Sequence, residues 1–130
     1  MTMRVNREDT YTEDDHVIVH YEGEPYTGEV VSHDKEGRLI QLQTYVDGVS
    51  TGPYRRWWPD GSVRSEGTLS LGAHVGEWHS WHRNGQLAKH IFYTDRGTGV
   101  CGRKWDKKGN LLQEYGTFPV DANSPAPPGN

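Results

Sequence analysis

The chain has 130 residues, of which only 32% are hydrophobic, and its formal net charge is −4. This length predicts a single domain, and no stretch approaches the ~18 apolar residues of a membrane span. The N-terminal residues lack the apolar core of a signal peptide, and a single cysteine excludes an internal disulfide. We therefore expect a cytoplasmic protein. Five tryptophans and seven tyrosines at regular positions argue against a disordered chain.

The N-terminal part of the chain is strongly acidic. Residues 1–48 hold four basic and eleven acidic side chains, whereas residues 49–130 hold ten basic and seven acidic ones. Such a polarised charge favours electrostatic steering toward a partner. Residues 1–15 show no periodicity, and we expect them to form either a polar cap or a short arm.

Glycine recurs at a fixed interval of 24 residues. One series is Gly28, Gly52 and Gly76, and a second is Gly37, Gly61, Gly85 and Gly109. A ring lies four residues before each second-series glycine, at His33, Trp57, Trp81 and Trp105. An aliphatic side chain lies two residues after it, at Leu39, Val63, Leu87 and Leu111. Self-similarity at such a period indicates a repeat array.

Each unit is predicted to be one β-hairpin. Asp60–Gly61 and Asn84–Gly85 separate short apolar runs and predict primed hairpin turns, because glycine accepts the positive φ that these turns require. Since a lone hairpin is marginal in water, consecutive hairpins must pair edge to edge. Residues 16–21 match the second strand of a leading half-repeat. The prediction is an all-β, elongated antiparallel β-meander of about four hairpin repeats, an open single-layer sheet over residues 16–118.

Stacking in register predicts a ladder of Trp57, Trp81 and Trp105 across alternate strands. The aliphatic row lies beside this ladder. A further row, six places after the aliphatic one, is expected on the same face: Tyr21, Tyr45, Leu69 and Tyr93. Beyond the array, the Pro/Ala-rich residues 119–130 are expected to be a disordered tail.

The sequence resembles the MORN repeat, in the variant found in YwqK-like bacterial antitoxin and immunity proteins. The unit that begins at Gly52 shows the pattern with Tyr54, Trp57, Asp60–Gly61 and Val63, and the next unit repeats it. The resemblance covers roughly residues 16–116. It implies a protein-binding antitoxin that neutralises a cognate protein toxin by steric occlusion. The alternative that it implies is a scaffold or a membrane-associated interaction module.

No pattern in the sequence predicts catalysis, a cofactor or a metal site. His79 and His82 have a two-residue gap, but on a strand they point to opposite faces and cannot share an ion. His74 and His90 lie in different strands. Cys101 occupies a repeat position at which other units carry polar residues, so we expect it to be exposed and without a catalytic partner. The expectation is a protein that is not an enzyme.

Aromatic and arginine side chains outside the ladder suit a protein-binding surface, since interfaces favour Trp, Tyr and Arg. An alternative role for Trp58 and Trp78 is packing under one of the chain ends. The acidic N-terminal half could cover a basic toxin surface. The candidate partner-binding residues are Tyr54, Arg55, Arg56, Trp58, Trp78, Glu22, Glu24 and Glu29.

Other partners fit the sequence less well. Bases interleave with aromatics around Arg55 and Trp105, as in nucleic-acid stacking platforms, but a net-acidic chain lacks the usual basic footprint. The same charge makes anionic membrane lipid a weaker choice. An exposed terminal strand leaves oligomerisation through a sheet edge open.

Overall fold

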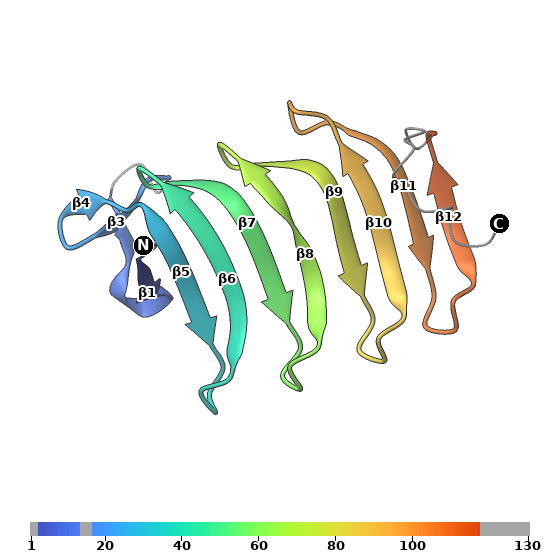
Figure 1. The fold of residues 1–130 in the computed structure, drawn as a ribbon, viewed down its shortest axis with the longest axis horizontal. Helices are drawn as coiled ribbons and strands as arrows, with labels where there is room; N and C mark the ends of the chain where they lie inside the picture. Colours follow the sequence, from blue (N-terminus) through green and yellow to red (C-terminus); the bar gives the residue numbers. More distant parts are fainter. Residues whose placement is uncertain (1–2, 14–16, 118–130) are drawn as a thin grey trace.

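The computed structural model describes residues 3–13 and 17–117, and this part of the chain is nearly all β-strand. A nine-stranded open sheet confirms the predicted all-β meander (Figure 1). Besides the 3₁₀ helix η1 (Arg7–Asp9), the elements are β1 (Arg4–Asn6), β2 (Tyr11–Thr12), β3 (Val19–Tyr21), β4 (Glu24–Pro25), β5 (Gly28–His33), β6 (Leu39–Val46), β7 (Val49–Trp57), β8 (Val63–Ser70), β9 (Ala73–Trp81), β10 (Leu87–Tyr93), β11 (Gly99–Trp105) and β12 (Leu111–Tyr115). The predicted tail, residues 119–130, lies outside the described residues.

Strands β5 to β12 follow one another across the large sheet, each antiparallel to the next. The N-terminal segment closes the first edge, because β1 lies parallel to β5 with Val5 opposite Val30. A cap of this kind hides the unpaired backbone groups of an edge strand. At the other end β12 pairs only with β11 among the described residues.

The expected leading half-repeat does not join the meander. Strand β3 pairs with β2 and β4 in a separate three-stranded sheet. The cause is a tight turn at Glu22–Gly23, where both residues have positive φ (51° and 87°) and the chain folds back at once. Tyr26, in the segment that follows β4, packs with Val30 and Tyr45 of the large sheet. The small sheet therefore covers one face of the large sheet over β5 and β6.

The hairpin turns are of two kinds. Between repeats, Leu71–Gly72 has positive φ at both residues (49° and 85°), as a two-residue type I′ turn requires. Within the third repeat, Gly85 has the predicted positive φ of 89°, but Asn84 does not. The Gly85 N–H donates to the carbonyl of His82 at 2.9 Å, as in a type I turn followed by a bulge glycine. The expectation of a primed turn at Asn84–Gly85 is therefore wrong in turn type.

In each repeat, one residue just after the turn within the hairpin has no cross-strand partner, and this residue changes which side chains share a face of the sheet. Arg56 pairs with Ser65 but Trp57 pairs with Val63, so Arg64 has no cross-strand partner. The other repeats skip a residue at the equivalent place. Since side chains alternate along a strand, one extra residue reverses the side on which later residues lie.

The Trp ladder and the tyrosine row consequently lie on opposite faces, and the prediction that they share one is wrong. The ladder face carries Trp57, Trp81 and Trp105. The tyrosine face carries Tyr45, Tyr54, Leu69, Trp78, Tyr93 and Tyr115. Tyr21 belongs to the small sheet instead.

Candidate protein-binding face

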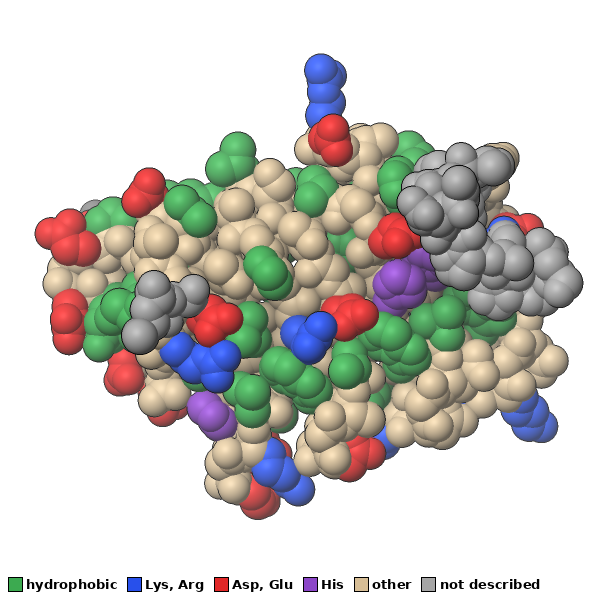
Figure 2. All heavy atoms as spheres, viewed as in Figure 1, with side chains coloured by type: hydrophobic (Ala, Val, Ile, Leu, Met, Phe, Trp, Pro, Cys, Tyr) green, Lys and Arg blue, Asp and Glu red, His purple; other side chains and the backbone are tan. Residues whose placement is uncertain are grey.

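Charged side chains of the strands are sorted between the two faces. On the ladder face, three carboxylates form ion pairs with arginines of neighbouring strands: Glu29 with Arg4 at 3.0 Å, Glu66 with Arg55 at 3.1 Å, and Glu114 with Arg103. A fourth carboxylate, Glu77, lies 3.4 Å from the imidazole of His90. In Figure 2 acidic and basic side chains lie next to one another along the middle of the visible face. Exposed pairs of this kind add little stability, but they balance the three arginines of the ladder face with carboxylates.

The tyrosine face carries a polar row that crosses eight strands in direct register. The row runs Ser32, Gln41, Arg56, Ser65, Ser80, Lys89, Lys104 and Gln113. Its three charged members are all cations. No carboxylate belongs to the row, and among the described residues none forms an ion pair with Arg56, Lys89 or Lys104. Unlike the ladder face, the tyrosine face is therefore positively charged.

An aromatic row runs beside this polar row. The Tyr54 and Trp78 rings lie 5.4 Å apart between centroids, and His74 lies 4.0 Å from Trp78 and 5.3 Å from Tyr93. The Trp78 indole N–H donates to the carbonyl of Thr68 at 3.1 Å. This hydrogen bond fixes the Trp78 ring flat across Gly67, where a Cβ atom would approach it to 2.2 Å. The rings form a rigid, half-exposed apolar surface.

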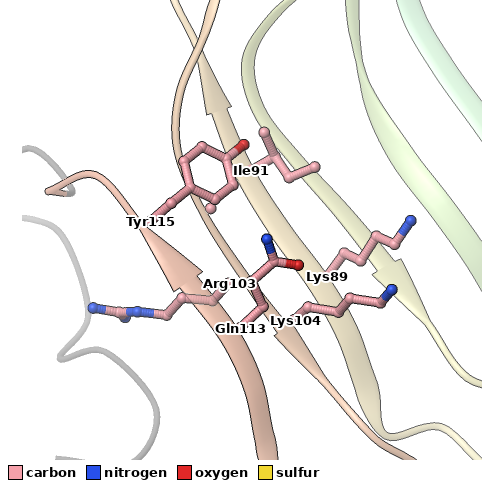
Figure 3. A pocket seen from close by; sticks show the side chains of 7 residues that line it. Lys89, Ile91, Arg103, Lys104, Gln113 and Tyr115 are labelled. Carbon is pink, nitrogen blue, oxygen red and sulfur yellow. The ribbon is translucent and has the colours of Figure 1, made fainter.

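The two rows meet in a groove of about 170 Å³ over β10, β11 and β12. Ile91 and Tyr115 form its apolar side, and the Tyr115 ring lies over Gly102. Lys89 and Lys104 form its basic side, and Figure 3 shows their side chains running next to each other in one direction. Arg103 points away from them in the same view.

The structure brings together three of the eight predicted binding residues. Tyr54, Arg56 and Trp78 lie on the tyrosine face. Arg55 lies on the ladder face, in its ion pair with Glu66. Adjacent strand residues cannot share a face, so the predicted Arg55–Arg56 pair is divided.

Trp58 lies just beyond the end of β7 and is half-buried. The guanidinium groups of Arg64 and Arg83 lie 4.5 Å and 5.6 Å from the centre of its ring. Its indole nitrogen is buried without a hydrogen-bond partner. These contacts give Trp58 a packing role at the turn and withdraw its ring from the tyrosine face.

The predicted acidic residues lie elsewhere again. Glu22 and Glu24 are exposed at the turn between β3 and β4. Glu29 lies on the ladder face and pairs with Arg4. None of the three belongs to the tyrosine face.

Two lysines of the tyrosine face, Lys89 and Lys104, were not among the predicted residues, although they are direct cross-strand partners. The pairing of the two lysines could have been found from the sequence, because the residue numbers of paired positions along a regular antiparallel hairpin have a constant sum. On the ladder face, the rings of His79 and His90 stack at 4.3 Å. The stacked histidines are not part of a metal cluster: the described residues contain no group of three or more metal-ligating side chains.

The expectation that Cys101 is exposed is wrong. This residue is fully buried on the ladder face of β11, opposite Phe92. Burial raises the pKa of the thiol, and a protonated thiol is a poor nucleophile.

Across residues 3–13 and 17–117, no helix has the length and hydropathy that a membrane crossing requires.

Comparison with known proteins identifies one repeat. Residues 75–95 match the family model described as the MORN repeat variant, and a repeat of this kind suggests a protein-interaction scaffold. No curated protein matches the chain. Two similar solved structures are TarM (13% identity, TM-score 0.40) and a mutant of S. aureus TarM in complex with fondaparinux, alpha-GlcNAc-glycerol and UDP (11% identity, TM-score 0.40). The matches cover 83% of this chain but only 19% and 20% of those chains, and likenesses this distant carry no argument about function.

Proposed function

We propose that this protein binds another protein through the tyrosine face over β7 to β12. The observation that carries the proposal is the ring cluster of Tyr54, His74, Trp78 and Tyr93, which lies beside unpaired cations on a sheet of one layer. Half-exposed Trp and Tyr side chains held rigidly are the usual anchors of protein interfaces. The small sheet covers the same face only over β5 and β6.

The more specific proposal is that the partner is a toxin, which this chain neutralises by covering its active or target-binding surface. The resemblance to YwqK-like antitoxins supports this choice. A broad sheet face suits steric occlusion, since it needs no catalytic group on this chain. Localisation in the cytoplasm, where such a toxin would act, belongs to the same proposal.

The test is co-expression with the product of the neighbouring gene. The wild-type chain should restore growth and form a stable complex, and Trp78→Ala should weaken both by removing the central ring. Arg55→Ala is the matched control, because Arg55 lies on the ladder face. Equal loss in the two variants, at unchanged thermal stability, would show that the tyrosine face is not the binding surface.

A membrane-associated scaffold is the second candidate, and the observation in its favour is the unpaired cations of the polar row. Three cations are fewer than the four to eight of a typical lipid-binding polybasic cluster. Vesicles that contain phosphatidylserine separate the candidates. Binding to these vesicles, with none to the neighbouring gene product, would replace the antitoxin proposal with the scaffold.

A further inference from the structure

Lys89 and Lys104 are directly opposite each other on adjacent antiparallel strands. Like charges in this position are destabilising, and no carboxylate among the described residues pairs with either. Every other cation on the strands of the large sheet except Arg56 has an acidic partner or lies at a strand end. The repulsion between two lysines held this way is relieved when an anion sits between them.

The surroundings of the lysine pair restrict the kind of anion. The groove beside them has an apolar side formed by Ile91 and Tyr115 (Figure 3), so the ligand carries apolar groups next to its charge. The same polar row continues to Arg56 through the hydroxyls of Ser65 and Ser80. Arg56 lies three strands from Lys89, which corresponds to about 14 Å at ~4.8 Å per strand.

The geometry points to an extended acidic segment of the partner protein as the ligand of this row, an inference that rests on the proposed function. In an extended peptide, residues i and i+4 are about 13 Å apart. Carboxylates at these positions reach Arg56 at one end and the Lys89–Lys104 pair at the other. Apolar residues between them lie against Tyr54, Trp78 and Ile91.

Nucleic acid fits the row less well. A nucleic-acid strand presents phosphates continuously, whereas here the middle of the row is two serines without charge. The chain as a whole has a net charge of −4, so it lacks the basic footprint of a nucleic-acid module.

The probe is a fluorescein-labelled extended peptide with glutamates at its first and fifth positions and a phenylalanine at its third, so that all three side chains lie on one side. Its affinity is measured by fluorescence anisotropy at two salt concentrations. The key variant is Lys89→Gln with Lys104→Gln. The control is Lys107→Gln with Lys108→Gln, which removes the same charge from the exposed turn after β11.

The variant in the row should bind the peptide at least about tenfold more weakly and with less salt dependence, whereas the turn variant should change affinity by less than about twofold. Without peptide, the row variant should melt no lower than wild type, because the like-charge pair is removed. This second readout separates lost binding from lost folding.

Three results would overturn the inference: equal weakening by both lysine pairs, equal affinity for a peptide with glutamine in place of glutamate, or tighter binding of a DNA duplex or phosphatidylserine vesicles. The outcome is separate from that of the proposed function. If the peptide fails while toxin neutralisation still depends on Trp78, the binding face stands and only the acidic ligand is wrong.

Discussion

At the scale of single residues, two glycines make the aromatic surface by lying under its rings. Gly67 lies under Trp78, and Gly102 lies under Tyr115, where a Cβ atom would approach Cε1 to 2.6 Å. Without a side chain at these positions, the rings lie flat on the backbone of the neighbouring strand. The sequence repeat places glycine at many turns, but neither of these two is a turn glycine.

We predict that Gly67→Ala destabilises the protein by about 1–3 kcal/mol, because the added methyl group displaces the Trp78 ring. The control is Gly99→Ala, where the nearest atoms lie at an ordinary 3.5 Å. The measurement is the free energy of unfolding in urea. Losses of the same size in both variants would show that Trp78 does not rest on Gly67.

At Gly85 the backbone alone sets the cost of a substitution. Its φ is 89°, and a Cβ atom there would meet nothing within 4 Å. Gly85→Val should therefore cost about 1–2 kcal/mol through backbone strain. Gly85→Asn should cost less, since asparagine adopts positive φ more readily. A valine variant as stable as the asparagine variant would contradict the turn geometry in solution.

At the scale of elements, the periodicity of the sequence predicts the hairpins but not their faces. The glycine interval and the apolar runs locate the strands of the repeats, and the open meander is confirmed. The faces could not be predicted, because the unpaired residue after each in-repeat turn, such as Arg64, has no distinct chemistry. The same residue decides that Tyr54 and Trp78 lie together while Arg55 lies on the opposite face.

The N-terminal elements could not be predicted from the repeat either. Residues 19–21 have the alternation of a strand, but their partner is set by the turn at Glu22–Gly23 and by packing of Tyr26. The Tyr26 hydroxyl lies 3.1 Å and 2.8 Å from the carbonyl oxygens of Met3 and Glu29. These contacts join the cap to the sheet across a long sequence separation, which local patterns do not encode.

The pairing of β9 with β10 produces a pH dependence. Burial and the stacked ring of His79 lower the pKa of His90 from its ordinary 6.5, although Glu77 opposes the shift. The folded protein therefore binds this proton less readily than the unfolded chain. The stabilising neutral form is fully present above about pH 6.5, and the free energy of unfolding falls as the pH drops below that value.

His90→Gln should make the free energy of unfolding less dependent on pH between 7 and 5. The turn aspartates Asp34, Asp60 and Asp106 do not interfere, because hydrogen bonds within each turn lower their pKa from 3.8 and they act below this window. Urea unfolding at several pH values measures the slope, with His33→Gln at the exposed end of β5 as control. A slope unchanged by His90→Gln would show that another group, such as His74, dominates.

At the scale of the whole molecule, the two faces of the sheet differ in charge. On the ladder face the arginines form ion pairs with carboxylates, whereas the tyrosine face carries aromatic rings and cations without an acidic partner among the described residues. The capped edge at β1 and the antiparallel order of the repeats hold this arrangement over all strands. Three of the residues predicted from the sequence, Tyr54, Arg56 and Trp78, lie together on the tyrosine face, which we propose as the binding face. Lys89 and Lys104 were not predicted as binding residues, because only the cross-strand register places them opposite each other.

The central claim, that the tyrosine face contacts the partner, is tested most directly by the indole N–H signals of the protein in NMR spectra. Trp78 is the tryptophan of the tyrosine face, whereas Trp57, Trp81 and Trp105 lie on the ladder face. Replacing each of these tryptophans in turn by phenylalanine assigns its indole N–H signal, because that signal disappears from the spectrum. Titration with the neighbouring gene product should shift or broaden the Trp78 signal and leave the three ladder signals in place. Shifts of the ladder signals with an unchanged Trp78 signal would contradict the account.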